Sequence, residues 1–516
     1  MIASLLLLGS SFAPLMASVS LSILRWRKAR LGFWWLATFL GGAITWVCLL
    51  GLRFFLPHQV ALVSWQPENL FPLSPELLAD GFSWVVGFAL ATVGVAVIFT
   101  EATTPDAERA LGWAGSSFLV GLGLIAIFAG NQLTLLLAWA AIDLVELLIW
   151  LSRPALPQLR ERVILAFSSR AFAVMLALWG LDNPWAYVFS ILLRWGVFPF
   201  HLPYLESPDL RRGLGTIIRI VPPLTTMPLL ARLADLGYFS EQSWISVFLG
   251  LIALFAALQW INSAEVIEGR PFWIIGTASF AFYAANLQRP EAVIAWALVL
   301  ALHGSFVFLI RGWERFWFPV FVYQSILLLG LPFTPFWDMM RVYRPTWSPA
   351  NILWLLSHLL LIAGYVRFIF QKPLETVEGE PWRIVLYRMA FGGLIGSSLM
   401  IGYGGWRNSL ETALSQPYLT SRNWMEYFVG LILALLSLLL AFLRRRRLLT
   451  RLRVPERLMR LFSMEWVYRF LQWGFRQLGG FYYQVEGVLE GKAGILWAIV
   501  LLLVLGRVFL FLGGGE

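Results

Sequence analysis

The chain has 516 residues, of which 59% are hydrophobic and 13% charged, and its mean hydropathy is +0.74. Soluble domains carry about 25% charged residues, so this composition excludes a soluble globular protein and indicates one that lies almost wholly in a bilayer. The formal charge of +10 comes from basic residues in short loops between apolar runs, a pattern that favours anionic lipids and not nucleic acid as their partner.

The apolar runs predict the fold class. About sixteen of them are long enough to cross the ~30 Å of hydrocarbon in a bilayer. They lie near residues 2–24, 31–56, 81–100, 111–129, 131–152, 163–181, 183–203, 214–236, 243–262, 271–288, 290–310, 316–334, 350–370, 384–403, 425–443 and 492–513. The sequence therefore predicts an all-α polytopic membrane protein with about 16 transmembrane helices.

Charge order predicts the orientation of these helices. The basic cluster 25–30 follows the first run and no basic residue precedes it, which is the reverse of the charge order of a cleavable signal peptide. Alternating crossings place the later basic loops, ending with Arg444–Arg453, on the same side as this cluster. We expect an integral protein of the bacterial inner (cell) membrane with its N-terminus outside and its basic loops in the cytoplasm.

The C-terminal part has a different pattern. Between residues 444 and 490, large apolar side chains recur at spacings of three and four, and arginines occupy the other face. The apolar positions are Met459, Phe462, Trp466, Phe470 and Trp473. This pattern predicts an amphipathic lateral helix along the cytoplasmic surface, serving either as an independent lipid-binding helix or as a strap on neighbouring subunits. A terminal transmembrane helix is expected over 491–516.

The composition excludes several kinds of site. Cys48 is the single cysteine, so the chain forms no internal disulfide or thiolate metal site. The four histidines are far apart and have no metal-ligand spacing, and the glycine-rich stretch 392–405 lies in an apolar helix pattern with no strand before it. We expect no metal and no cofactor bound by this chain.

One charged residue lies inside an apolar helix. Arg194 occurs in the stretch 187–210, where the helix pattern is interrupted at Gly196 and Pro199. A charge at the centre of a bilayer costs about 2.5 to 3.5 kcal/mol on insertion scales, so such residues face a protein interior, a cavity or a partner. The sequence therefore predicts a buried site around Arg194.

Four stretches together resemble one family. They are NQLTLLLAWAAIDLVELLIWL (131–151), RWGVFPFHLPYLESP (194–208), LVLALHGSFVFLI (298–310) and GLPFTPFW (330–337). Their order, spacing and sidedness resemble the antiporter-like membrane subunits of NADH-quinone oxidoreductase (complex I subunits L, M and N), Mrp antiporters and membrane-bound hydrogenases. The chain is most similar to the long form, which ends in a lateral helix and one last span.

The resemblance implies two inverted five-helix repeats, each with a broken helix. The corresponding breaks would be Gly196 and Pro199 in the first repeat and Gly330, Pro332 and Pro335 in the second, and interrupted helices in matching positions indicate an ion pathway; packing kinks are the alternative. The expected divisions are 1–110 (N-terminal helices), 111–236 and 237–371 (the two repeats), 372–443 (accessory helices), 444–490 (lateral helix) and 491–516 (terminal helix).

Family members are credited with proton transfer through a glutamate and several lysines, and this chain departs from that set. The glutamate position holds Ala140, with Asp143 and Glu146 displaced along the same helix, and the first lysine position holds Arg194. Lysine titrates when it is buried, whereas arginine stays protonated. An ion pair from Arg194 to either acid would be fixed, with Arg194 as an electrostatic element or as part of a water-mediated route.

The later positions depart in the same way. Where relatives have a lysine or histidine on the eighth helix, this chain has the neutral stretch 224–226 with Arg219 nearby. A further lysine is replaced by Val307, although His303 matches the family's histidine, and the exit lysine falls at Met339, with Asp338 and Arg341 beside it. His201 and His303 are possible relays or satisfied buried histidines. The pathway candidates are Asp143, Glu146, Arg194, His201, Arg219, His303 and Asp338.

The resemblance implies a subunit for proton (or sodium) transport in a redox-driven complex of a respiratory chain, with reduced or lost translocation in this member. Flavin, iron–sulfur and quinone chemistry would belong to partner membrane and soluble subunits, and the chain itself would be a non-catalytic subunit of the translocase. Two alternatives stay open. The chain could be a purely structural assembly subunit or a stand-alone cation/proton antiporter.

Overall fold

The computed structural model describes two units, Met1–Leu452 and Arg453–Glu516. The described residues of the first unit are 1–27, 31–64, 73–101, 109–152, 157–180, 183–197, 201, 204, 212–239, 242–310, 317–331, 334, 336–343, 349–371, 381–403 and 424–445. In the second unit the description covers single positions between 466 and 503.

The N-terminal part is a helix pair followed by a β-hairpin. It consists of α1 (Ile2–Trp26), α2 (Leu31–Leu52), η1 (Arg53–Phe55), β1 (His58–Ala61) and β2 (Glu76–Ala79). The strands are antiparallel, with His58 opposite Ala79. The hairpin was not predicted; it lies in the segment 57–80, between the apolar runs 31–56 and 81–100. Its second strand also forms a bridge from Leu77 to Ala129, which ties the hairpin to the end of the fourth helix.

The helices of the first predicted repeat and the one before it follow. They are α3 (Gly81–Glu101), α4 (Arg109–Ile127), α5 (Gln132–Leu151), α6 (Pro157–Trp179), α7 (Pro184–Arg194), α8 (Arg212–Leu224) and α9 (Met227–Asp235). The helices α8 and α9 are the two short halves of one candidate membrane span, Arg212–Asp235. The chain turns at Thr225 and Thr226 between α8 and α9, directly after two prolines that remove backbone donors.

The remaining helices are α10 (Ser243–Asn262), α11 (Val266–Asn286), α12 (Pro290–Leu298), the π-helical turn η3 (Val299–His303), α13 (Gly304–Leu309), α14 (Phe318–Leu328), η5 (Trp337–Val342), α15 (Pro349–Ile369), α16 (Pro381–Tyr403) and α18 (Trp424–Arg445). Ten of the described helical spans are long and apolar enough to cross a membrane. Fifteen of the sixteen predicted runs coincide with described helices, and the last run lies mostly outside the described residues. The all-α polytopic prediction is confirmed.

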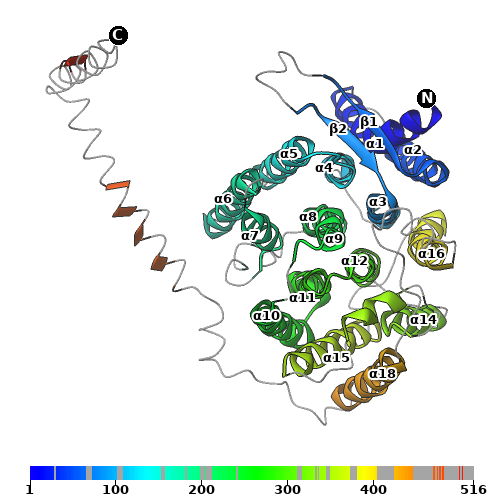
Figure 1. The fold of residues 1–516 in the computed structure, drawn as a ribbon. Coiled ribbons are helices and arrows are strands. Elements are labelled where there is room, and N and C mark those ends of the chain that lie inside the picture. Colours follow the sequence, from blue (N-terminus) through cyan, green and yellow to red (C-terminus); the bar gives the residue numbers. More distant parts are fainter. Residues whose placement is uncertain are drawn as a thin grey trace. The chain divides into compact units, whose positions relative to one another are not determined.

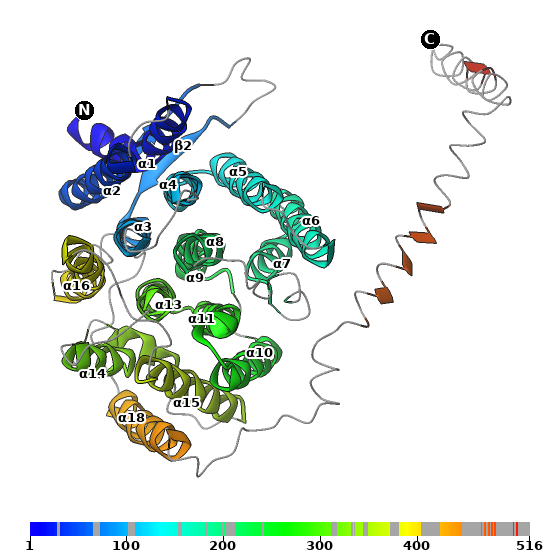
Figure 2. The ribbon, with the colours of Figure 1, turned by 180° about the vertical axis from the view of Figure 1, so that it is seen from behind.

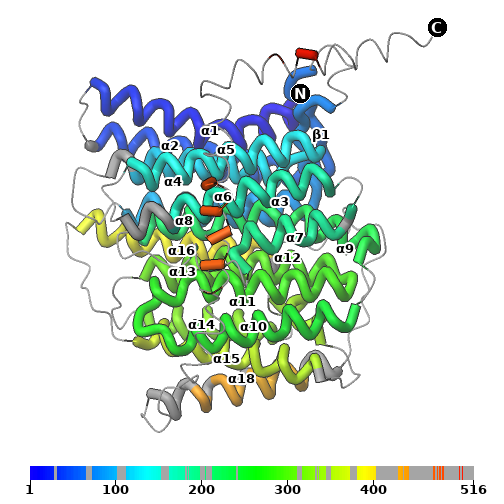
Figure 3. The backbone as a smooth tube through the Cα atoms, turned by 90° about the vertical axis from the view of Figure 1, so that its left-hand side faces the viewer, coloured from blue at the N-terminus to red at the C-terminus, as the bar shows by residue number. Residues whose placement is uncertain are grey.

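The helices of the first unit lie side by side, with the hairpin strand β1, the N-terminus and α9 at the same end (Figure 3). Viewed along the helices, α5, α6 and α7 lie next to one another, and α8 and α9 lie between them and α11 (Figure 1). The opposite view places α3 and α13 in the interior as well (Figure 2). The spans α3, α8–α9 and α12–α13 are almost wholly buried, so they form the axis of the bundle.

Two of the predicted break residues, Gly196 and Gly330, lie just after the ends of helices. Gly196 ends α7 with φ +65° and Gly330 follows α14 with φ +56°, and such positive φ values favour glycine. Pro199, Pro332 and Pro335 lie outside the described residues. The lateral-helix prediction also falls mostly outside them. Its described positions from Trp466 to Gly480 are helical, and α18 reaches into its predicted start by ending at Arg445.

Candidate functional site: a buried charge cluster

Arg194 lies at the C-terminal end of α7, a helix of 11 residues. The helix begins at Pro184 because the side chain of Asn183 accepts a hydrogen bond from the backbone N–H of Trp185 at 3.0 Å. It ends after Arg194 because Gly196 adopts a left-handed conformation. The short helix therefore presents Arg194 to the interior of the bundle, where its side chain is fully buried.

Asp143 on α5 is the partner of Arg194. The guanidinium donates two hydrogen bonds to the carboxylate, at 2.9 Å from Nη1 to Oδ2 and at 3.1 Å from Nη2 to Oδ1. Trp139 lies one turn before Asp143, and the guanidinium of Arg194 stands 4.5 Å from the centre of its ring. Because both charges are buried and matched in this planar geometry, they form a strong, fixed pair.

A second arginine completes the cluster. Arg170, near the middle of α6, donates a hydrogen bond to Glu146 and lies 3.8 Å from Asp143. Glu146 is three residues from Asp143, so both acids occupy one face of α5. The sequence analysis missed Arg170, although it lies in the apolar run 163–181 and obeys the rule that identified Arg194.

Tyr204 holds the other side of Arg170. Its ring centre lies 5.1 Å from the guanidinium, and its hydroxyl donates to the carbonyl of Leu193 at 3.0 Å. The ring also packs on Gly196, where a Cβ atom would collide with it. Tyr204, which follows the break of α7 in the sequence, thereby packs against the cluster.

A cavity of about 20 Å³ adjoins the cluster. Three arginines line it, from α6, α7 and α8, together with aromatic and apolar side chains. Its lining is Arg170, Arg194, Trp195, Tyr204, Arg219, Pro222, Pro223, Pro271, Ile274 and Ile275. About 10 to 15 Å³ suffices to hold one water, so this cavity has room for one small particle.

Four of the predicted residues thus come together: Asp143, Glu146, Arg194 and Arg219, which acts electrostatically on Glu146. The cluster contains permanent positive charges, since arginine does not release its proton in proteins. The cluster can fix helices α5 to α8 relative to one another and can orient a small polar particle.

Asp338 belongs to a second cluster. It lies 3.3 Å from Arg341 on η5, and Arg341 donates to Glu291 of α12 at 2.7 Å. Glu291 was not among the predicted residues. The segment η5 packs on α12, α11 and α18, whereas α7 packs on α6 and α8. The structure therefore separates Asp338 from the Arg194 cluster.

The two predicted histidines lie among aromatic rings. His201 is buried with its ring 5.6 Å from that of Phe255, and His303 is buried in the π-helical turn, 4.6 Å from Phe336 and 5.8 Å from Tyr365. Neither contacts Asp143 or Glu146 in the described hydrogen bonds.

Stacked aromatic side chains lie between α11, α12 and α15. Phe280 lies 4.2 Å from Trp296 and 4.7 Å from Trp354, measured between ring centres, and Trp354 stacks on Tyr283 at 4.1 Å. His358 lies against the same rings and hydrogen-bonds the hydroxyl of Tyr343 at 2.9 Å. Dense aromatic packing leaves little room for a chain of waters in this region.

A further ion pair lies at the hairpin end of the bundle. Asp80, between β2 and α3, accepts a hydrogen bond from Arg232 at 2.8 Å and another from the backbone of Ser83 at 2.8 Å. Burial raises the pKa of Asp80, but the charge and hydrogen bond of Arg232, with those from Ser83, outweigh it and hold the pKa below its ordinary value.

At the other end of the bundle, Glu101 caps a helix. This residue ends α3, and its carboxylate accepts a hydrogen bond from the backbone N–H of Leu214 at 2.9 Å, in the first turn of α8. A carboxylate at a helix N-terminus satisfies an otherwise unpaired N–H and interacts favourably with the helix dipole. The contact fixes the start of the helix that carries Arg219.

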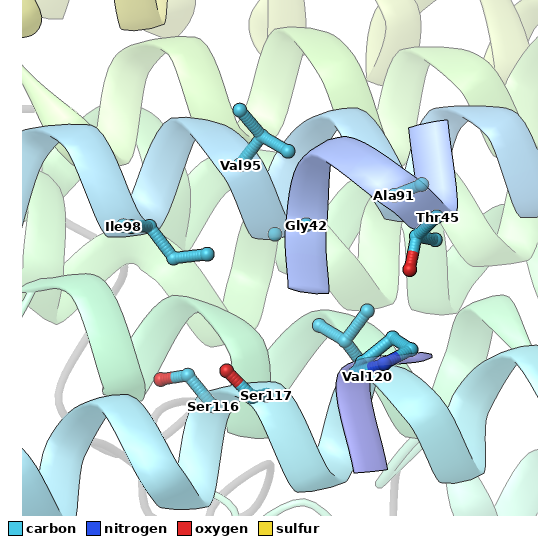
Figure 4. A pocket seen from close by; sticks show the side chains of 10 residues that line it. Gly42, Thr45, Ala91, Val95, Ile98, Ser116, Ser117 and Val120 are labelled. Carbon is cyan, nitrogen blue, oxygen red and sulfur yellow. The ribbon is translucent and has the colours of Figure 1, made fainter. Parts of the chain in front are cut away.

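Another cavity of about 20 Å³ lies between α1, α2, α3 and α4 (Figure 4). Its lining contains no charged side chain among the described residues, and small or apolar groups such as Gly42, Ala91 and Val120 surround it. The hydroxyls of Ser116 and Ser117 are buried there without a hydrogen-bond partner in the described structure.

The buried charge cluster lies in a polytopic helical fold that chains of other solved structures share. No family model and no curated protein matches the sequence. Several solved structures have a similar fold. A chain of the Mrp complex from Dietzia sp. DQ12-45-1b has a TM-score of 0.74 at 14% identity, over 99% of this chain and 62% of its own length. A chain of respiratory complex I from Thermus thermophilus has a TM-score of 0.56 at 17% identity over 76% of this chain and 97% of its own.

A chain of the membrane-bound sulfane sulfur reductase, an archaeal respiratory membrane complex, has a TM-score of 0.68 at 13% identity, over 97% of this chain and all of its own length. This chain spans about 62% of the length of the Mrp chain that it matches. The chain has the fold of these three chains, and the resemblance inferred from its four motifs is confirmed at the level of the fold.

Proposed function

We propose that this chain is an antiporter-like membrane subunit of a redox-driven, ion-pumping complex of the NADH-quinone oxidoreductase type. Its support is the shared fold, since the similar chains belong to an Mrp complex, a respiratory complex I and a respiratory membrane complex. It lies in the bacterial cell membrane with its N-terminus outside. Its basic cytoplasmic loops bind anionic lipids, and its partners are other membrane subunits and a soluble redox arm.

This subunit has reduced proton translocation of its own. One observation carries the proposal: Arg194 and Asp143 form a buried bidentate pair at the position where proton transfer in the family is attributed to a lysine. An arginine that never deprotonates cannot pass a proton. The cluster instead serves as an electrostatic support for the helices around the break of α7.

The test measures protons pumped per electron in vesicles that contain the whole complex. We expect the double variant Asp143→Asn/Arg194→Gln to keep this ratio, since neutralising both members leaves no unpaired charge. The matched control is Glu291→Gln/Arg341→Gln in the second cluster. A lower ratio in an intact complex that carries the first double variant would establish the cluster as part of the proton route.

A purely structural subunit is the second proposal, favoured by the stacked rings of Phe280, Trp296 and Trp354. This structural role requires that no variant of either cluster alters pumping, and that loss of the chain removes neighbouring subunits from the membrane.

A stand-alone cation/proton antiporter is the third proposal, favoured by the likeness to the Mrp chain. Exchange activity of the purified chain alone in liposomes would support it against both others.

A further inference from the structure

Among the described residues, the cavity between α1, α2, α3 and α4 is lined by neutral groups only (Figure 4). Glycine, alanine and branched apolar side chains form most of the lining, and its polar side chains are the hydroxyls of Thr45, Ser116 and Ser117. A buried ion without a compensating charge is very costly. Any occupant of this cavity is therefore expected to be neutral.

Two of these hydroxyls lack a partner. The Oγ atoms of Ser116 and Ser117 are buried without a hydrogen-bond partner in the described structure, and the two residues are only 2% and 5% exposed. Figure 4 shows both hydroxyls on the side of α4 that faces α3. Buried polar groups in native proteins are nearly always paired with protein or with ordered water. The two serines therefore call for an occupant that forms hydrogen bonds.

Other serines in the helices of this chain pair with their own backbone. Their hydroxyls donate to the carbonyl four residues earlier, as from Ser20 to Met16 at 2.8 Å, from Ser279 to Ile275 at 2.7 Å and from Ser398 to Leu394 at 2.9 Å. This local bond satisfies a helical serine away from water. Ser116 and Ser117 make no such bond in the described structure, so both hydroxyls are available to the cavity.

The third hydroxyl of the lining is already engaged. Thr45 donates to the carbonyl of Gly41 at 2.8 Å, which is the helical bond that the two serines do not make. The need for a partner thus comes from the two side chains of α4. A serine hydroxyl has one donor and two acceptor positions, so an occupant that both donates and accepts can bind Ser116 and Ser117 together.

We propose that this cavity binds one ordered water molecule, held by the hydroxyls of Ser116 and Ser117 where the N-terminal helix pair packs on α3 and α4. The volume of about 20 Å³ exceeds the roughly 10 to 15 Å³ that one water needs, and two polar partners suffice to hold it. An apolar occupant such as a lipid acyl chain would leave both hydroxyls unpaired, which is costly. The site does not depend on the proposed function, because neither serine belongs to the charge cluster.

The first experiment is a map of the full chain in its complex, at a resolution that shows ordered waters elsewhere in the assembly. We expect a single compact peak in the cavity, about 2.7 to 2.8 Å from the Oγ atoms of Ser116 and Ser117. Elongated density that continues toward the lipid would identify an acyl chain and overturn the proposal. A cavity without a peak would overturn it as well.

The second experiment repeats the map with variants. Ser116→Ala/Ser117→Ala removes both hydroxyls and adds no bulk, so we expect the peak to disappear. The matched control is Ser397→Ala/Ser398→Ala, a pair of adjacent buried serines on α16 whose hydroxyls have partners on α3 and within α16 itself. The peak should remain in this control. A peak retained in the first double variant, or lost in the control as well, would overturn the assignment.

Thermal unfolding of the detergent-solubilised full chain tests the same pair in solution. Residues that share one hydrogen-bond network are energetically coupled, so the two serines are coupled if one water joins them. We expect the midpoint shift of the double variant to be smaller than the sum of the shifts of Ser116→Ala and Ser117→Ala. The shifts of the control pair should add, since Ser397 and Ser398 bind separate partners. Additive shifts in the first pair, or an equal deviation in the control pair, would contradict a shared water.

Discussion

The guanidinium of Arg194 and the carboxylate of Asp143 are joined by two hydrogen bonds across α7 and α5, 51 positions apart in the sequence. Both side chains are buried, so each is the other's means of avoiding an unpaired charge in a medium of low dielectric constant. The pair fixes the end of α7, a helix of 11 residues that ends at Arg194.

Removing one member of this pair should be more harmful than removing both. We expect Arg194→Ala to cost about 3 to 5 kcal/mol of stability, because it leaves Asp143 charged and buried, and the double variant Arg194→Ala/Asp143→Ala to recover part of that loss. Thermal unfolding of the solubilised chain measures both. Arg25→Ala, at an exposed position, should change stability by no more than about 0.5 kcal/mol. A double variant less stable than Arg194→Ala would contradict the pairing.

Arg170 and Arg194 should be energetically coupled through Asp143. Arg170 lies 3.8 Å from an oxygen of that carboxylate, and Arg194 binds the same group. Residues that share a partner show interaction energies of about 0.5 to 3 kcal/mol in double-mutant cycles. A cycle of Arg170→Gln and Arg194→Gln should therefore deviate from additivity by such an amount. The cycle of Arg170→Gln with Arg341→Gln, which belongs to the second cluster, should be additive.

Asp80 and Arg232 should make stability sensitive to acid. The pKa of Asp80 is lower in the folded chain than its ordinary value of 3.8, so the folded state binds this proton less readily than the unfolded state. The stabilisation is present at neutral pH and is lost as the pH falls below about 3.8 toward the folded pKa. Asp80→Asn should lower the unfolding midpoint at pH 7 and remove part of its decline in acid. An identical acid profile in Asp80→Asn and the parent chain would refute this assignment.

Much of the fold could be predicted because a bilayer permits few structures. Apolar runs of about 20 residues must be helices that satisfy their own backbone, so run length alone located helices in fifteen of the sixteen predicted runs. The hairpin over His58–Ala61 and Glu76–Ala79 was not predicted, because two strands of four residues carry little periodic signal and depend on the bridge from Leu77 to Ala129. The π-helical turn at Val299–His303 likewise has no local signature.

The site was predicted in part for a related reason. Arg194 was predicted because it lies beside a helix break in an apolar run. Asp143 and Glu146 were predicted because they lie in the family-like stretch 131–151. Arg170 belongs to no motif, and its role depends on α6 packing beside α5 and α7, which the sequence does not specify. Glu291 was missed because it lies at the start of α12, where an acidic residue is ordinary, and its pairing with Arg341 is visible only in three dimensions.

Glu101 should matter through the helix that it caps. Its carboxylate accepts from the backbone N–H of Leu214, in the turn that leads to Arg219. We expect Glu101→Ala to cost about 0.5 to 2 kcal/mol, the range for loss of a helix cap, and Glu101→Gln to retain the hydrogen bond at a smaller cost. Glu268→Ala on α11 is the control, because its first-turn carboxylate makes no hydrogen bond in the described structure. Equal stability of both alanine variants, measured by thermal unfolding, would exclude the cap.

Gly196 should tolerate no side chain. Its φ of +65° lies in the left-handed region, which costs an L-residue about 1 to 2 kcal/mol, and a Cβ atom there would also strike the ring of Tyr204. Because that ring packs against Arg170, Gly196→Ala should also displace one wall of the cavity. Gly392→Ala, in an exposed part of α16 where a Cβ meets nothing within 4 Å, should be neutral or stabilising by up to about 1 kcal/mol. Unfolding midpoints compare the two variants, and a Gly196→Ala chain as stable as Gly392→Ala would show that the break of α7 does not depend on this glycine.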